Sequence, residues 1–335
     1  MRKINENSLI FENTYILATS TIAGKLEKNG PLGNYFDKTY DDNHCGLKSW
    51  EKAEMRLFED AINILLDKTN LKEKDISLVI GGDLNNQIVI NNYVLKKYDI
   101  PFLGIYAACS TITEGLIIGS ICVDSKLENI IVATSSHNST SERQFRNPTE
   151  YGGQKNNTTT FTATGGVATL ITSKKTRIKI TKATIGKVID STLLDPCDMG
   201  RVMAPAAVST FLQHLKDFKI SPDDYDLIVT GDLSTYGKEV FIKLLEKHNI
   251  KLSNYQDTGL MIYDIKKQPV FSGGSGSSCI GLVGLGYLYN LMIEKKYKKI
   301  LLIATGALLN PIMTFQKETI PGIAHAVALE RVDEC

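Results

Sequence analysis

The chain contains the same order of elements twice, and this internal repeat constrains the fold more than any other feature of the sequence. Residues 75–84 and 225–233 each predict a short buried strand that ends in a glycine turn, and the two strands lie 149 residues apart. Further on, Cys109 and Cys279 each open an apolar helical segment that leads to another apolar strand, and these segments lie 170 residues apart. The shared order indicates a duplicated unit.

Helices that alternate with short, continuously apolar strands predict layers of helix and of mostly parallel sheet. A helix precedes each glycine turn, because apolar residues recur at helical spacing from Trp50 to Leu65 and, less regularly, from Ala206 to Leu215. Two such units predict an α/β fold of five layers, αβαβα, with a pseudo-twofold axis. Its halves are expected to be residues 1–174 and 175–335.

Residues 135–164 are rich in Ser, Thr, Asn and Gly, and they exceed the length of an ordinary connection. We expect a long loop here, either a functional lid or a disordered segment. Its charged and aromatic residues are Arg143, Phe145, Arg146, Tyr151 and Lys155.

Composition excludes several classes of protein. The 335 residues have a formal net charge of +1, with no basic excess for neutralising nucleic-acid phosphates. The first eight residues lack the apolar segment of a secretory signal, so secretion is not expected. The uncharged residues 268–293 have an apolar part too short to span a membrane, and they predict a buried helix instead. Six cysteines at single positions indicate reduced thiols.

Two positions could carry chemistry. Cys109 follows a strand and opens a helix, where unpaired backbone N–H groups favour a thiolate or a bound anion. The alternative is that Cys109 is simply a small buried apolar residue. Residues 272–279 form a glycine- and serine-rich turn before the second helix, which suits either close approach of a ligand or tight packing near the axis. This turn lacks the third glycine of a dinucleotide fingerprint.

Two α/β halves with a cysteine at one helix start and a glycine turn at the matching place resemble the thiolase and ketoacyl-synthase superfamily. Longer strings, from about Phe11 to Arg331, resemble the stage V sporulation protein AD family of endospore-forming bacteria. They are Gly30-Pro-Leu-Gly33, Phe36-Asp-Lys-Thr-Tyr40, Ala133-Thr-Ser-Ser-His-Asn138, Glu142-Arg-Gln-Phe-Arg146, Pro148-Thr-Glu-Tyr-Gly-Gly-Gln-Lys155, Met203-Ala-Pro-Ala-Ala207 and Ile320-Pro-Gly-Ile-Ala-His-Ala326.

This resemblance implies a non-catalytic protein that binds dipicolinic acid, with or without calcium, and takes part in loading it into the developing spore. It implies a soluble homodimer that associates peripherally with the forespore membrane, beside the other stage V sporulation A membrane proteins, and it implies no cofactor. The superfamily's nucleophile falls on Cys109, but its histidine and asparagine fall on Gly231 and Gly274. Acyl transfer through Cys109 is the alternative activity, and a purely structural role is a third possibility.

Dipicolinate is a flat dianion, so its site needs N–H donors, positive charge and an apolar wall. We expect amides from the two helix starts, an arginine clamp from Arg201, Arg143 or Arg146, and Tyr151 as a wall. Structural ion pairs are the alternative for each arginine. His325 could be a core or a pocket residue, His137 a lid or a pocket residue, and His214 and His248 are expected at the surface. The full predicted site is Cys109, Ser110, His137, Asn138, Arg143, Arg146, Tyr151, Arg201, Gly274, Ser275 and His325; no metal site is expected, since no acidic cluster forms a calcium loop.

Overall fold

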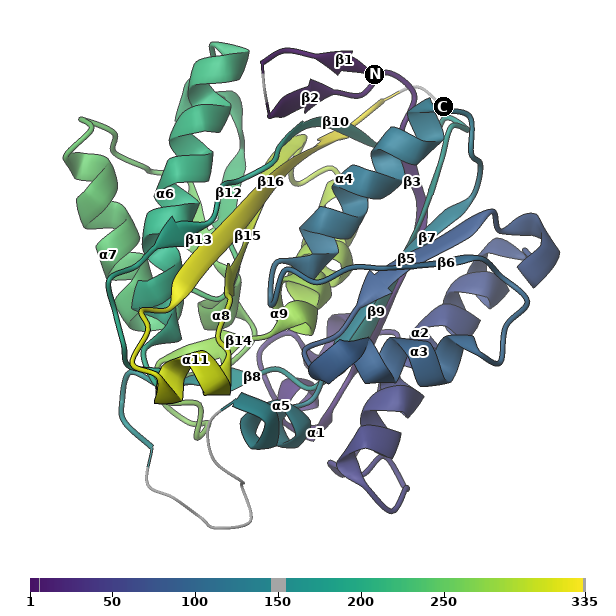
Figure 1. Cartoon of the computed structure of the whole chain (residues 1–335). Coiled ribbons are helices and arrows are strands. Elements are labelled where there is room, and N and C mark those ends of the chain that lie inside the picture. Colours follow the sequence, from purple (N-terminus) through teal and green to yellow (C-terminus); the bar gives the residue numbers. More distant parts are fainter. Residues whose placement is uncertain (6, 146–154, 334–335) are drawn as a thin grey trace.

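The computed structural model describes residues 1–5, 7–145 and 155–333, and Figure 1 shows them as alternating layers of helix and sheet. The long strands fall into two runs of five that meet where β3 pairs with β10. The first run, from its edge inward, is β6 (Phe102–Gly104), β5 (Leu78–Gly82), β7 (Ile130–Ser136), β9 (Gly165–Thr172) and β3 (Tyr15–Ala23). The second is β13 (Tyr255–Asp257), β12 (Leu227–Thr230), β15 (Lys299–Ala307), β16 (Pro321–Arg331) and β10 (Ile178–Thr184).

The two runs match strand for strand, in order along the chain and in direction. In each run the outer three strands are parallel, and the inner two pair antiparallel with their neighbours. The strands predicted from the repeat, β5 and β12, therefore occupy equivalent positions, as expected. The prediction of mostly parallel strands was right only for the outer strands, because the sequence pattern shows burial but not direction.

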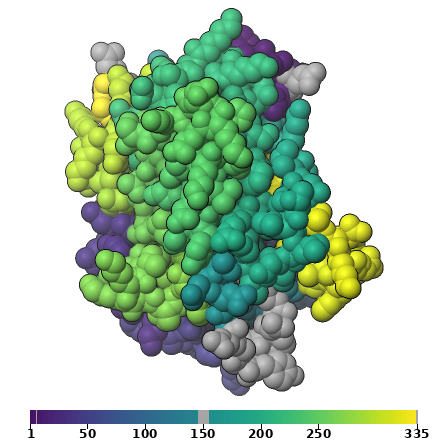
Figure 2. All heavy atoms as spheres, turned by 90° about the vertical axis from the view of Figure 1, so that its left-hand side faces the viewer, coloured from purple at the N-terminus to yellow at the C-terminus, as the bar shows by residue number. Residues whose placement is uncertain are grey.

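Helices cover both outer faces of the sheet and fill the space between its halves. On one outer side lie α2 (Trp50–Thr69) and α3 (Val89–Leu95), and on the other lie α6 (Met199–Phe218) and α7 (Ser234–Glu246), which cover the face seen in Figure 2. Between the halves lie α4 (Thr111–Asp124) and a continuous helical segment made of α9 (Ser277–Gly281), a π-helical stretch (Leu282–Leu288) and α10 (Tyr289–Ile293). The predicted five-layer fold is thus confirmed.

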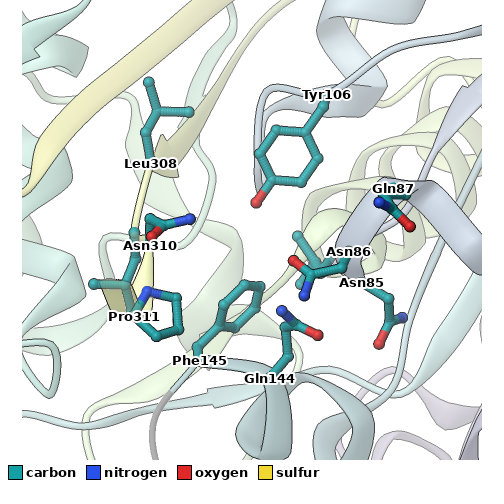
Figure 3. A pocket seen from close by; sticks show the side chains of 11 residues that line it. Asn85, Asn86, Gln87, Tyr106, Gln144, Phe145, Leu308, Asn310 and Pro311 are labelled. Atoms are coloured by element: carbon teal, nitrogen blue, oxygen red, sulfur yellow. The ribbon is translucent and has the colours of Figure 1, made fainter. Parts of the chain in front are cut away.

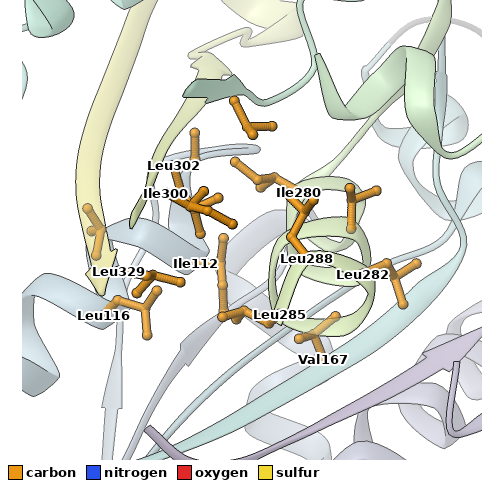
Figure 4. Packing of buried hydrophobic residues seen from close by; sticks show 14 of the residues in the cluster. Ile112, Leu116, Val167, Ile280, Leu282, Leu285, Leu288, Ile300, Leu302 and Leu329 are labelled. Atoms are coloured by element: carbon orange, nitrogen blue, oxygen red, sulfur yellow. The ribbon is translucent and has the colours of Figure 1, made fainter. Parts of the chain in front are cut away.

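The central helices form one hydrophobic core with both halves of the sheet. Figure 4 shows Ile112 and Leu116 of α4 packed near Leu285 and Leu288 of the π-helical stretch. Strand residues from both halves close this core, among them Val167, Ile300, Leu302 and Leu329. Each buried leucine or isoleucine contributes about 1.5–3 kcal/mol when it leaves water, so the shared layer ties the two halves together. The buried helix expected in residues 268–293 is present, and over the described residues no helix has the length and hydropathy to cross a bilayer.

Short elements complete the fold. Residues 135–164 are not one long loop as predicted, since they contain α5 (Asn138–Phe145) and β8 (Thr160–Thr162), and β7 extends into them. β8 pairs in parallel with β14 (Gly273–Ser275) of the other half. The remaining elements of the described residues are short strands and helices, namely β1 (Arg2–Lys3), β2 (Ser8–Ile10), β4 (Lys38–Thr39), β11 (Ile189–Asp190), α1 (Lys25–Lys28), α8 (Thr258–Met261) and α11 (Pro311–Phe315), together with 3-10 turns at Gly33–Tyr35, Glu73–Asp75, Asn86–Ile88 and Pro222–Asp224.

Candidate functional site

Cys109 lies in the tight turn between β6 and α4, at the border of the central layer. Ala108 before it has a left-handed φ of 49°, a conformation that is uncommon for a residue with a side chain. Cys109 is only 6% exposed. The Ser110 hydroxyl donates to the carbonyl of Ala107 at 2.7 Å, so this side chain holds the turn and is not directed at a ligand.

The Asp232 carboxyl connects the two halves at this turn. It follows β12, is fully buried, and accepts a hydrogen bond from the Gly276 N–H at 3.1 Å. The thiols of Cys279 and Cys109 interact with the same carboxyl. Burial and the nearby Asp257 charge raise the pKa of Asp232 well above its usual range, which favours the neutral acid. The predicted convergence of Cys109 with the glycine turn is therefore present, with Asp232 between them.

Gly231 and Gly274, which the resemblance predicts at the superfamily's histidine and asparagine positions, are closely surrounded by other side chains. A Cβ on Gly231 would lie 3.1 Å from Ile280 Cβ and Cδ1. A Cβ on Gly274 would lie 2.9 Å from Ile262 Cγ2 and from Tyr263 Cε2. A side chain at either position would therefore have to displace these apolar and aromatic neighbours.

A cavity of about 250 Å³ opens beside this turn, between the two halves of the chain (Figure 3). We call it the carboxamide cavity, after the amide side chains in its wall. It is lined by Leu84, Asn85, Asn86, Gln87, Tyr106, Gln144, Phe145, Leu308, Leu309, Asn310 and Pro311. None of these residues carries a formal charge. Figure 3 shows the Tyr106 hydroxyl directed into the space between Asn310 and Asn86, with the Phe145 ring below it.

Two buried carboxyls fix one wall of the carboxamide cavity. Glu54 Oε2 accepts from the Asn85 side-chain amide at 3.1 Å, and Asp83 Oδ1 accepts from the Asn85 backbone N–H at 2.9 Å. Burial and the Asp83 charge raise the pKa of Glu54 to about 8. By contrast, no hydrogen bond of the Asn86, Gln87 or Gln144 amide group is found among the described residues.

The histidines and the other small polar residues of the predicted site lie outside the cavity. His137 is buried, not at a surface lid: its Nδ1 accepts from the Ser139 N–H at 3.1 Å, so Nε2 carries the proton and donates to the Asn43 carbonyl at 2.7 Å. Asn138 opens α5 and binds Thr164 through its backbone. Ser275 donates to Thr160 Oγ1 at 2.9 Å.

His325 and His214 have structural roles in the second half. His325 is buried in the interior of that half, where its Nδ1 accepts from the Gly186 N–H at 3.1 Å. Of the two expected roles, core residue or pocket residue, this is the first. His214 was wrongly predicted at the surface, because Thr184 and Tyr225 bind its two ring nitrogens at 2.9 and 2.7 Å and allow complete burial. His248 is exposed, as expected.

The predicted cations form ion pairs outside the cavity wall. Arg143 pairs with Glu51 and lies over the Trp50 ring, with its guanidinium carbon 5.3 Å from the ring centre. Arg201 pairs with Asp198 at 3.1 Å and lies over the Tyr236 ring. Lys155 pairs with Glu142 at 3.3 Å. Arg143 and Arg201 thus form structural ion pairs, which was the alternative to a ligand clamp. Arg146 and Tyr151 fall outside the described residues.

Several residues of this region were missed in the sequence. The run Asn85-Asn86-Gln87 directly after a strand was a signal for polar groups at the sheet edge. In the sequence, Asp232 was used only to align the two copies of the repeat. Its position directly after a buried strand was a signal that its carboxyl is shielded from solvent. Gln144 and Asn310 had no such signal, because only the fold brings them to one cavity. Among residues 1–5, 7–145 and 155–333, no cluster of three His, Cys, Asp or Glu could hold a metal ion.

Comparison with known proteins gives one family and one fold. A family model described as stage V sporulation protein AD matches residues 5–330. The chain is 48% identical over 334 residues to stage V sporulation protein AD of Bacillus subtilis strain 168, which covers 99% of this chain and 98% of that protein.

Solved structures at lower identity share the fold. A variant of Xanthomonas campestris OleA matches at a TM-score of 0.60 with 12% identity, over 96% of this chain and 99% of that one. 3-Oxoacyl-[acyl-carrier-protein] synthase III from Aquifex aeolicus matches at 0.54 with 18% identity, over 95% and 99% of the two chains. Human mitochondrial 3-ketoacyl-CoA thiolase in complex with CoA matches at 0.57 with 12% identity, over 98% and 100%. These matches support a thiolase-like fold alone.

Proposed function

The chain belongs to the stage V sporulation protein AD family and has a role in sporulation on a thiolase-like scaffold, and from this we propose that it binds dipicolinate in the carboxamide cavity for uptake into the developing spore. The observation that carries the proposal is the set of uncommitted amides, Asn86, Gln87 and Gln144, around a cavity that also has the Phe145 ring in its wall. Amide N–H groups can donate to carboxylate oxygens, and an aromatic ring can stack on a flat pyridine ring.

The uncharged wall favours one form of the ligand. A dianion in a cavity without cations would keep its full charge away from water, which is costly. With calcium the same molecule is neutral overall, and amide oxygens are suitable further ligands for that ion. We therefore expect dipicolinate to enter as its calcium chelate more favourably than as the free dianion, as cargo and not as a resident metal site.

Catalysis is not part of the proposal. Thioester chemistry needs a base or donor beside the thiol and paired donors for the oxyanion. The packing at Gly231 and Gly274 and the buried acid Asp232 beside Cys109 support a scaffold that has lost this set. Acyl transfer through Cys109 remains the competing activity, and acyl-coenzyme A turnover distinguishes the two.

The test is calorimetric titration with dipicolinate, with and without calcium, beside acetyl- and malonyl-coenzyme A. Gln144→Ala and Asn86→Ala should each lose a hydrogen bond to a charged acceptor, about 1.5 kcal/mol or roughly tenfold in Kd. The control is Asn34→Ala, an exposed amide away from the cavity. Binding unchanged in both cavity variants would place the ligand elsewhere, and steady release of coenzyme A would support the enzyme instead.

A further inference from the structure

A second cavity, of about 270 Å³, lies at the opposite end of the sheet from the carboxamide cavity. It is lined by Arg177, Ile293, Lys295, Arg331, Val332 and Asp333, and we call it the Arg331 cavity. Strand β15 runs from one cavity to the other. Lys298, just before the strand, accepts a hydrogen bond from the Arg331 N–H, and Leu308, just after it, lines the carboxamide cavity. At ~3.3 Å per strand residue the two cavities are roughly 30 Å apart, so they are separate sites.

Three segments of the chain bring cations to the Arg331 cavity. Arg177 lies in the turn before β10, and its carbonyl accepts from the Val332 N–H at 2.8 Å, which holds the two segments together. Lys295 follows the end of α10, and Arg331 ends β16. The wall therefore has three cationic side chains and one carboxylate, Asp333. This local excess contrasts with the chain's net charge of +1.

The guanidinium of Arg331 is incompletely paired. Its side chain is only 12% exposed, and its Nε is buried without a hydrogen-bond partner in the described residues. A buried donor without an acceptor is costly and suggests a bound group. Its Nη1 pairs with Asp333, whose carboxylate also lies 3.8 Å from Lys298 Nζ. The Arg177 and Lys295 side chains have no ion pair among the described residues.

We propose that the Arg331 cavity binds a phosphate-type oxyanion, held by the guanidinium groups of Arg177 and Arg331 and by the Lys295 ammonium. Two guanidinium groups match phosphate oxygens through paired hydrogen bonds, and a divalent anion suits three cations from three directions. The Asp333 carboxylate also lines the cavity and pairs with Arg331, so it competes with the anion for this guanidinium. A free phosphate ester and the headgroup of an anionic lipid present the same chemistry to this site.

The test uses the full chain and pyrophosphate as the probe, titrated calorimetrically at low ionic strength. Arg177→Ala and Lys295→Ala should each weaken binding at least roughly threefold and the double variant more than tenfold, because charge-assisted hydrogen bonds are lost. Asp333→Asn should tighten binding by removing the competing carboxylate. Lys243→Ala, an exposed lysine on α7, is the matched control and should change nothing.

The source of the anion is separated by sedimentation with vesicles of phosphatidylcholine, with and without phosphatidylglycerol. Parent protein that sediments only with phosphatidylglycerol, and a double variant that does not, identify a lipid headgroup. Pyrophosphate binding without sedimentation identifies a free phosphate compound. No binding of either probe, or equal binding by parent and double variant in both assays, overturns the proposal. Arg177 is exposed, so its replacement tests the site without removing a buried side chain.

Discussion

At the scale of single residues, Glu54, which binds Asn85 of the carboxamide cavity, makes the stability of the fold depend on pH. It is fully buried on α2, and burial with the nearby Asp83 charge raises its pKa from 4.5 to about 8. Between these values the folded protein holds a proton that the unfolded chain has released. The free energy of unfolding therefore falls as pH rises across this window, by up to about 1.4 kcal/mol per pH unit.

Glu54→Gln removes this titration, so its melting temperature should fall less between pH 5 and pH 8 than that of the parent protein. Thermal unfolding followed by circular dichroism at a series of pH values measures the difference. Glu59→Gln is the control, since Glu59 lies on the same helix and pairs with Lys97 at the surface. Parallel curves for Glu54→Gln and the parent would show that Glu54 is ionised in the folded protein at neutral pH.

From the sequence, the repeat indicated which two turns share a site, whereas the partners of single charged side chains depend on distant packing that the sequence does not show. The helix starts at Cys109 and at the glycine turn were expected to supply amides to one site, and both turns contact Asp232. Arg143 was one of three candidate clamps, with a structural ion pair as the alternative, and it pairs with Glu51, 92 residues earlier. Nothing in a linear sequence indicates which acid a given arginine will meet, so clamp and ion pair could not be distinguished.

At the scale of elements, the packing around the turn after β12 and around strand β14 sets the cost of placing a histidine at Gly231 and an asparagine at Gly274. Gly231→His and Gly274→Asn would place side chains where Ile280, Ile262 and Tyr263 already pack. Overpacking of this kind costs about 1–3 kcal/mol per site. The double variant should melt several degrees lower than the parent and release no coenzyme A from acyl-coenzyme A above background. Activity at parental stability would mean that the scaffold still accommodates the catalytic set.

Helix α5 shows why one element could not be predicted. Its sequence is rich in Ser, Thr and Asn, which favour turns over helix interiors. The helix forms because of contacts from elsewhere: the buried Glu54 accepts from the Thr140 hydroxyl at 2.5 Å, and Ser139 to Glu142 are buried. In contrast, α2 carried its own signals, since Ser49 caps its start and Asn70 ends it in a left-handed conformation.

At the scale of the whole molecule, strand β6 leaves one edge of the sheet open. It pairs only with β5 in the described residues, and Leu103 within it and Tyr106 just after it are 43% and 44% exposed. An exposed apolar edge invites pairing with another chain. We expect a homodimer through β6, and Leu103→Arg should shift it to monomer in light scattering after gel filtration. Leu127→Arg, at a similarly exposed leucine after α4, is the control. A parent that is monomeric at micromolar concentration would contradict this prediction.

Strand β2 cannot reach its final place in the sheet until the second half of the chain has been synthesised. Strand β2 is synthesised well before β10 of the other half, with which it pairs, and the Ser8 hydroxyl also donates to Asp217 at 2.6 Å. The ribosome adds roughly 5–20 residues per second, so β2 waits about 10 to 35 s before β10 emerges. Until then, the core residues Leu9 and Phe11 lack their final partners in the second half. Strand β2 therefore stays open to proteases until β10 of the second half has been made.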